Sequence, residues 1–184
     1  SYKKNNSGKI TIEYKNLGAE KPFELVIFQG GSGETDTATE RKIFSDTVKK
    51  IIKTIHQSGA EAALYMIHAY TEPHESANSQ MIEDITQMYI NAGNENNALV
   101  IPVGIAFENA YKHNPDIQLH KSFDGSHPSL LGTYLAACVV FSSITHETPL
   151  NIQYNYFNKI SDEDKKFLQR MAHQTVEDFF KIEL

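Results

Sequence analysis

Short apolar runs alternate with helical segments along this chain, and this alternation limits the possible folds more than any other feature of the sequence. The runs end near Phe28, Ile67 and Val103, and a helix-like pattern of apolar residues follows each of them. Strands that alternate with helices form βαβ units, whose strands lie parallel in one sheet. The sequence therefore predicts an α/β protein of three layers, α/β/α, with helices on both faces of a mostly parallel sheet.

The individual elements follow from hydrophobic periodicity and from capping residues. Strands are predicted over 9–14, 23–28, 62–67 and 98–103. The first alternates as an edge strand does, and the second is apolar enough to be buried on both faces. Thr37 and Ser161 have the spacing of capping boxes and predict the starts of two helices. Further helices are predicted over 79–91, 104–111 and 130–144, and a flexible lead-in over 1–9.

Size and composition predict one globular domain over residues 1–184. The chain is 40% hydrophobic and 22% charged, with a net charge of -6. Basic residues occur at most as adjacent pairs, which argues against nucleic acid as a partner. No apolar run reaches the length of a membrane span, which argues against a membrane protein. The single cysteine, Cys138, is expected to be a buried small apolar residue, and the sequence has no cysteine–histidine metal spacing and implies no cofactor.

The functional residues of a parallel α/β sheet collect at the carboxyl ends of its strands. Three predicted loops lie there, over 29–36, 68–78 and 120–128. The third contains Asp124-Gly-Ser-His127-Pro-Ser and runs into an apolar helix. A hydrolase that uses a serine needs an imidazole to take the proton of the nucleophile and a carboxylate to orient that imidazole. Asp124 and His127 are therefore candidate catalytic residues, although the spacing alone equally fits a turn-forming aspartate beside a surface histidine.

The longer sequence around this pair resembles the last motif block of the SGNH (GDSL-type) hydrolases. Asp124-Gly-Ser-His-Pro-Ser is followed by Gly132-Thr-Tyr-Leu-Ala-Ala, and Ile101-Pro-Val-Gly-Ile-Ala precedes it where a bacterial branch of the family has a similar segment. Weaker similarity extends from about residue 20 to about residue 180. The resemblance implies a flavodoxin-like SGNH sheet, with His127 as the general base and Asp124 as its orienting carboxylate.

The same resemblance implies an activity and a substrate class. SGNH hydrolases cleave carboxylic esters, and this branch points to an acetyl or other short acyl group on a carbohydrate. The expected partner is thus a small-molecule or glycan ester, and a secreted or periplasmic location is slightly favoured. Oligomeric state is left open. The competing interpretation is a catalytically inactive relative that uses the same cleft to bind a glycan or a partner.

The block that carries the nucleophile in this family has no counterpart in the sequence. It places a serine at the end of the first strand, in a Gly-Asn-Ser or Gly-Asp-Ser setting, and the strand lies centrally in the sheet. The chain begins at Ser1 rather than at methionine. We therefore expect an N-terminal strand and helix, with the serine, to precede residue 1, and the missing strand to lie between those predicted at 9–14 and 23–28. The alternative is that another strand takes this central place.

Four more residues are candidates for the oxyanion or substrate site. Where the family commonly has Gly-x-Asn-Asp, this chain reads Gln29-Gly30-Gly-Ser32. Gln29 and the N–H group of Gly30 are candidate oxyanion donors, with a plain glycine turn as the alternative. Ser32 is a candidate substrate contact and, less favoured, a substitute nucleophile. His68 ends a predicted strand and is a candidate substrate contact.

A metal site is the weakest interpretation of the histidines. His68, His74 and His127 form a conceivable ligand set. No two of them have the helical spacing of paired ligands, and no cysteine accompanies them. We therefore assign no metal.

Overall fold

The computed structural model describes residues 2–4, 10–12 and 23–184 of the chain. Its strands are β1 (Tyr2–Lys4), β2 (Ile10–Ile12), β3 (Leu25–Phe28), β4 (Glu61–Tyr65) and β5 (Leu99–Ile101). Its α-helices are α1 (Ala38–Gln57), α2 (Met81–Asn96), α3 (Val103–His113), α4 (Leu130–Thr145) and α5 (Asp162–Phe180). Two 3-10 turns, η1 (Ser32–Thr35) and η2 (Pro149–Asn151), complete the described elements.

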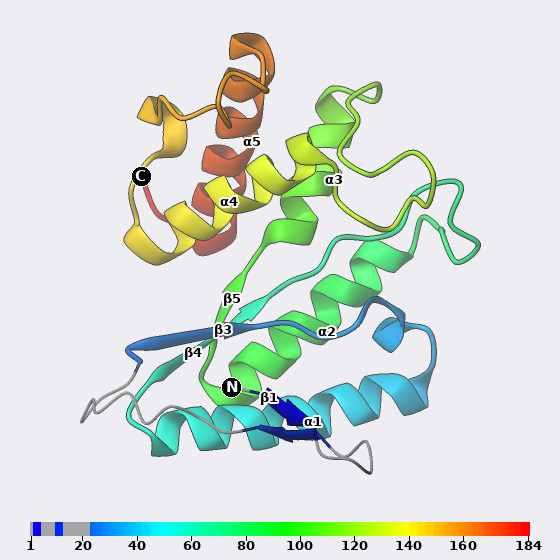
Figure 1. The fold of residues 1–184 in the computed structure, drawn as a ribbon, viewed down its shortest axis with the longest axis vertical. Helices are drawn as coiled ribbons and strands as arrows, with labels where there is room; N and C mark the ends of the chain where they lie inside the picture. The colour runs from blue at the N-terminus through cyan, green and yellow to red at the C-terminus, as the bar shows by residue number, and fades with distance from the viewer. Residues whose placement is uncertain (1, 5–9, 13–22) are drawn as a thin grey trace.

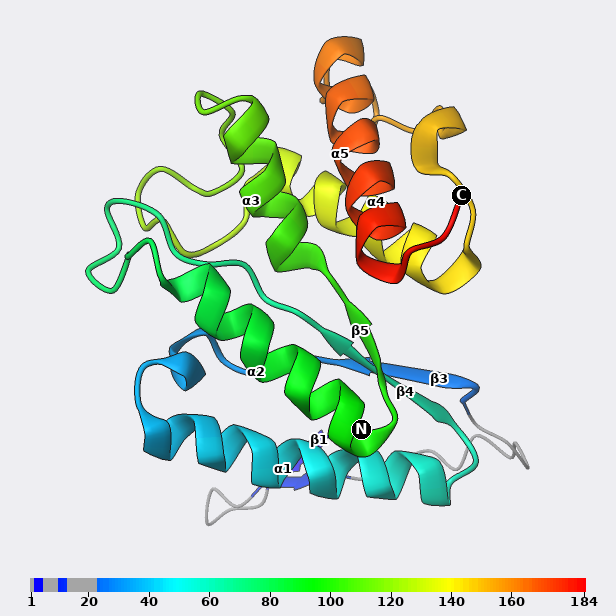
Figure 2. The ribbon, with the colours of Figure 1, turned by 180° about the vertical axis from the view of Figure 1, so that it is seen from behind.

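Strands β3, β4 and β5 form a parallel sheet in that order. Helices α1 and α2 cover one face of it, and α3, α4 and α5 lie on the other (Figures 1 and 2). The side chains of β4 alternate between the two layers, since Ala62 and Leu64 pack towards α1 and α2 while Ala63 packs towards the opposite helices. The predicted three-layer α/β/α fold is confirmed.

The expected helix starts follow from local hydrogen bonds. Thr37 accepts the N–H of Glu40 at 3.1 Å and caps α1, and Ser161 accepts the N–H of Asp164 at 3.0 Å and caps α5. Ser129 caps α4 in the same way, because its hydroxyl oxygen accepts the N–H of Gly132 at the start of that helix. Helix α2 runs five residues beyond the predicted end at residue 91.

Strand β5 is shorter than predicted. Pro102 precedes α3, and Val103 is already its first residue, so the prediction of a strand to residue 103 was wrong at its end. Proline has no N–H for a sheet hydrogen bond but is well tolerated just before a helix. Cys138 is buried in α4, as expected.

Strand β3 is an edge strand in the described part of the sheet, and the prediction that both of its faces are buried was wrong. Its Ile27 side chain is 40% exposed, and Phe23 just before it is 57% exposed. The carbonyl of Glu24 accepts the N–H of Glu61 at 2.8 Å. Alternate residues of a parallel strand bond to the same neighbour, so Val26 faces β4 and the backbone groups of Leu25 and Ile27 face the free edge.

The N-terminal strands form a separate sheet. Tyr2–Lys4 and Ile10–Ile12 pair antiparallel, with Tyr2 opposite Ile12. The strand predicted over 9–14 is therefore present in part, but it pairs with β1 instead of joining the main sheet, and residues 9, 13 and 14 lie outside the described residues. Residues 2–4 are strand rather than the lead-in expected there.

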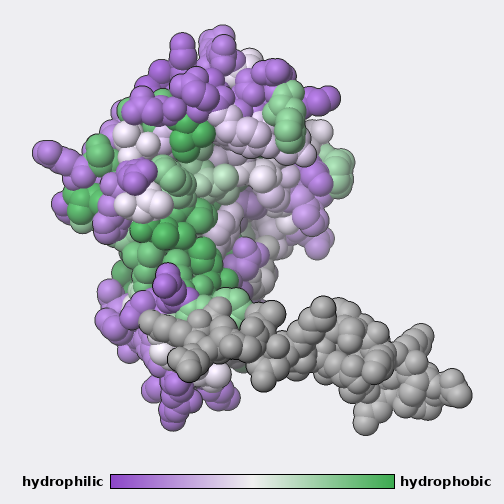
Figure 3. All heavy atoms as spheres, turned by 60° about the vertical axis from the view of Figure 1, so that its left-hand side comes forward, coloured by the Kyte–Doolittle hydropathy of each residue, from purple (hydrophilic) through white to green (hydrophobic). Residues whose placement is uncertain are grey.

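Apolar residues gather on one side of the molecule at the level of the sheet. Figure 3 shows this surface between the hydrophilic residues at the top of the view and those at the bottom. Within the described residues, no helix combines the length and the apolar character that crossing a bilayer requires.

Candidate active site

Two of the three predicted loops meet at the carboxyl end of the sheet. The N–H of Thr71, after β4, donates to the carbonyl of Gly125 at 2.9 Å. The ring of His120, at the start of the loop over 120–128, lies 3.0 Å from the carbonyl of Ala69 through Nε2. These bonds hold the segment over 120–128 against the segment over 68–78, and so fix the position of the residues between His120 and the start of α4.

Asp124 and His127 form a hydrogen-bonded pair in this loop. The Nδ1 atom of His127 lies 2.8 Å from Oδ2 of Asp124. The other carboxylate oxygen accepts the backbone N–H groups of Ser126 at 2.9 Å and His127 at 3.0 Å. One oxygen therefore builds the turn while the other orients the imidazole. The turn-forming interpretation of Asp124 is thus observed, and its catalytic role stays a prediction.

The electrostatics of this pair favour an ionised carboxylate. The backbone N–H of Ser126, together with the N–H and the imidazole of His127, lowers the pKa of Asp124 to about 2. At neutral pH Asp124 is consequently charged, and its carboxylate accepts a hydrogen bond from an N–H at Nδ1 of His127. When the imidazole is neutral, a proton on Nδ1 leaves the lone pair on Nε2, which is what a general base requires.

The remaining face of His127 is open. Its side chain is 70% exposed, and among the described residues its ring bonds only to Asp124. Its backbone is held, because the carbonyl of His127 accepts the N–H of Lys121 at 2.8 Å. The arrangement presents Nε2 to solvent from a fixed backbone, so a further group can bond to it.

The loop over 29–36 contributes fewer free groups to the candidate active site than its sequence suggested. The N–H of Gly30 donates to the hydroxyl oxygen of Tyr89 at 3.0 Å, so in this structure that donor has a partner inside the protein. Gln29 is exposed at the end of β3, and Ser32 begins the η1 turn. The oxyanion and substrate roles of Gln29, Gly30 and Ser32 stay predictions.

His68 lies at the carboxyl end of β4, and it contacts a residue that the sequence analysis missed. Its Nδ1 lies 3.1 Å from Nε2 of His120, and Nδ1 of His120 lies 2.7 Å from the hydroxyl oxygen of Tyr111. Burial and then the neighbouring His120 lower the pKa of His68 to about 4. The signal for His120 was its place as the first residue of the predicted loop over 120–128.

The ring of His74 contacts residues of its own loop. It stacks on the ring of Tyr70, with centroids 3.7 Å apart, and its Nδ1 accepts the N–H of Ser76. In the chain from residue 23 onward and in the two short N-terminal strands, no three His, Cys, Asp or Glu side chains lie together as metal ligands would.

Two of the cavities beside the loop over 68–78 share Thr71 in their walls. One, of about 390 Å³, lies between that loop and α3 and is lined by residues that include Tyr70, Glu72, Glu108 and Tyr111. The other, of about 300 Å³, includes Thr71, Tyr111 and His120 in its wall. Thr71 lines both cavities and bonds to Gly125, the neighbour of Asp124. Both cavities are thus adjacent to the loop that carries the candidate dyad.

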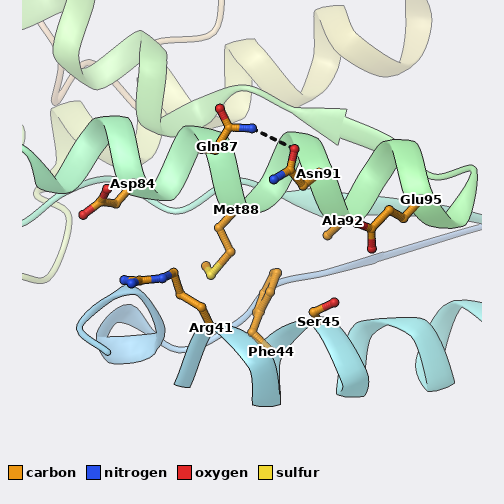
Figure 4. Close-up of a pocket in the computed structure, with 9 residues that line it drawn as sticks. All are labelled: Arg41, Phe44, Ser45, Asp84, Gln87, Met88, Asn91, Ala92 and Glu95. Carbon is orange, nitrogen blue, oxygen red and sulfur yellow. Dashed lines mark hydrogen bonds between the residues drawn. The ribbon is translucent and has the colours of Figure 1, made fainter. Parts of the chain in front are cut away.

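A third cavity, of about 360 Å³, lies between α1 and α2 (Figure 4). Its polar side chains are partly engaged with one another, since the amide of Gln87 donates to that of Asn91 at 2.7 Å. None of the candidate site residues lines it. We therefore do not connect it with the chemistry of Asp124 and His127.

Comparison with known proteins gives structural neighbours. No protein-family model matches the chain, and a search of curated proteins finds no match. A DUF4886 family protein from Bacteroides uniformis has a TM-score of 0.76 at 21% identity, covering 100% of this chain and 74% of the other. A candidate SGNH hydrolase from Slackia heliotrinireducens has a TM-score of 0.57 at 21% identity, covering 66% of this chain and 65% of the other.

A third neighbour is the acetyl xylan esterase AlAXEase. Its TM-score is 0.52 at 18% identity, and the match covers 66% of this chain and 67% of the other. At these identities the likeness concerns the fold. The chain therefore has an SGNH-like fold.

Proposed function

We propose that the protein hydrolyses a carboxylic ester, with His127 as the general base and Asp124 as the carboxylate that orients it. The 2.8 Å contact between the two side chains is the observation that carries this proposal. In ester hydrolysis the base removes the proton of a serine as the serine attacks the acyl carbon, and then returns it to the leaving alcohol. The resulting acyl-enzyme is hydrolysed by water that the same base activates.

The nucleophilic serine is proposed to come from a strand that precedes residue 1 and pairs with the free edge of β3. Two features of β3 support this position. The backbone groups of Leu25 and Ile27 face outwards, and the Ile27 side chain is 40% exposed although it is apolar. A strand added there would bond to the outward groups and cover the side chain, and its carboxyl end would lie at the same edge of the sheet as His127.

A carbohydrate ester is the proposed substrate class. The cavity of about 390 Å³ is lined by two tyrosines and two glutamates. Tyrosine rings pack against the apolar faces of sugars, and carboxylates accept hydrogen bonds from hydroxyl groups. The structural likeness to an acetyl xylan esterase also supports an acetyl group as the acyl part, which remains a proposal for this chain.

Turnover of p-nitrophenyl acetate by the full-length protein tests the role of His127. We expect His127→Ala to reduce kcat at least about 100-fold, the low end of what a general base contributes. The matched control is His113→Ala, because His113 is an exposed histidine at the end of α3 whose ring, within the described part of the chain, bonds only to the carbonyl of Asn109. Unchanged turnover in His127→Ala would rule out the assigned role. If the wild type itself fails to hydrolyse esters, the inactive, glycan- or partner-binding interpretation is favoured instead.

A further inference from the structure

Three side chains from three segments form a hydrogen-bonded chain beside the candidate dyad. The hydroxyl oxygen of Tyr111, on α3, lies 2.7 Å from Nδ1 of His120. Nε2 of His120 lies 3.0 Å from the carbonyl oxygen of Ala69 and 3.1 Å from Nδ1 of His68. His120 is only 6% exposed, so this chain of contacts is largely shielded from water.

The partners of His120 determine where the protons lie. The carbonyl of Ala69 can only accept, so Nε2 of His120 carries the proton. Burial lowers the pKa of His120, so its ring is neutral and its Nδ1 accepts the O–H of Tyr111. Nδ1 of His68 then faces an N–H group and must accept as well. The proton of neutral His68 is therefore on Nε2.

Packing fixes the direction in which that N–H points. The ring of His68 stacks on Phe107, with centroids 4.5 Å apart and planes 20° apart, and meets the ring of His120 edge-on at 4.6 Å. Rotation of the ring out of this plane would break both contacts, and a 180° flip would replace Nδ1 by a carbon and lose the contact with His120. Within the described residues no hydrogen-bond partner is assigned to Nε2 of His68, and this atom is not one of the buried unpaired polar atoms. The N–H group is thus available to a ligand.

His68 also lies near the base of the proposed reaction. His120 and His127 are close in space although seven residues apart, because the N–H of Lys121 bonds to the carbonyl of His127 and His120 pairs with Pro128. His68 contacts His120 through its Nδ1 atom. A charged imidazole at His68 would oppose the imidazolium that His127 forms during acyl transfer, whereas a neutral donor would not.

We propose that Tyr111 and His120 are positioning residues that hold His68 as the neutral Nε2–H tautomer, so that this N–H donates to an oxygen of the ester bound at His127. The inference rests on the proposed ester hydrolysis and adds a specific donor and its support to it. His68 is the residue that touches the substrate. His120 and Tyr111 act through it.

Nitrogen NMR of the histidine rings tests the tautomer without any assay of activity. In the ¹⁵N-labelled full-length protein at pH 7, long-range ¹H–¹⁵N spectra should show an unprotonated Nδ1 and a protonated Nε2 for His68. The His68→Gln variant identifies the signals by their loss. The opposite tautomer, or a mixture of the two, would overturn the inference.

Variants test the positioning role in the reaction. His120→Phe keeps a ring against Phe107 but removes both nitrogens, and we expect kcat/KM for p-nitrophenyl acetate to fall about tenfold, the equivalent of one hydrogen bond. His120→Gln, whose amide N–H can replace Nε2, should recover part of that loss. Tyr111→Phe removes a single oxygen and should give a smaller loss together with a mixed tautomer. His113→Gln is the control and should match the wild type.

The outcomes separate this inference from the proposed function. Wild-type protein without esterase activity would overturn the proposed function and with it the role of His68. Esterase activity with the opposite tautomer, or equal activity in all His120 variants, would overturn the inference alone. If His120→Phe fails to fold, the wild-type spectrum and Tyr111→Phe still decide the question.

Discussion

Thr71 and Gly125 join the two loops that build the candidate site, through a 2.9 Å hydrogen bond from the N–H of Thr71 to the carbonyl of Gly125. Gly125 has a φ of +62°, and a Cβ atom at this position would collide with the backbone of Thr71 and Glu72. The loop that carries Asp124 and His127 can approach so closely only because this residue is glycine.

Replacing this glycine should disturb both stability and site geometry. Gly125→Ala must adopt a left-handed conformation, at a cost on the order of 1–3 kcal/mol, and must also relieve a backbone collision. We expect a lower free energy of unfolding in urea and a strong loss of esterase activity. Gly33→Ala is the control, since its Cβ would make only an ordinary contact with Asp36. Equal effects of the two substitutions would contradict the close approach.

Amide exchange should reveal whether a strand covers β3. In the full-length protein we expect the N–H groups of Leu25 and Ile27, which face away from β4, to exchange as slowly as that of Val26, which bonds within the described sheet. The Val26 amide is an internal control, because its bond does not depend on the added strand. Fast exchange at Leu25 and Ile27 beside slow exchange at Val26 would show that this edge is open.

The lowered pKa of His68 predicts a loss of stability in mild acid. Its pKa is about 4 in the folded protein, against about 6.5 in an unfolded chain. Between these values the unfolded state binds the extra proton, so stability falls as the pH falls from about 6.5 to about 4, by roughly 3 kcal/mol from this group. Asp124, with its pKa lowered to about 2, changes the stability only at pH values below this interval.

Urea unfolding at a series of pH values checks this expectation. His68→Phe keeps an aromatic ring against Phe107 and removes the titrating group. The difference in stability between wild type and variant should shrink by roughly 3 kcal/mol from pH 7 to pH 4. A difference that stays constant over this range would show that His68 titrates normally.

The layers of the fold were predictable because periodicity is a local property. The apolar positions of α1 and the capping oxygen of Thr37 are legible in the sequence, and the helix follows them. The environment of β3 was predictable only in part. Its apolar residues suit a central strand, and the family resemblance implied that a neighbouring strand is missing from the sequence. The exposure of its side chains follows from the sheet order, in which one edge of β3 is free among the described residues. A local pattern likewise does not indicate which strand pairs with Ile10–Ile12, and in the structure this strand is Tyr2–Lys4.

In the candidate site, too, local contacts could be predicted from the sequence and long-range contacts could not. Asp124 and His127 are three residues apart, so their contact could be inferred from spacing within one turn. The contact between His68 and His120 joins residues 52 positions apart, and no local pattern indicates it. The N–H of Gly30 was one candidate oxyanion donor, and in the structure the hydroxyl of Tyr89, on α2, accepts that group. Contacts of this kind emerge only when the helices pack.

Mapping the serine that reacts with a fluorophosphonate probe tests the proposed mechanism most directly. The full-length protein would be treated with the probe, digested and analysed by mass spectrometry, with His127→Ala as the unreactive control. We predict one labelled serine in a segment that precedes residue 1, with labelling lost in the control. Labelling of Ser32 would contradict the proposed origin of the nucleophile in the strand beside β3, and no labelling of the wild type would contradict ester hydrolysis by a serine.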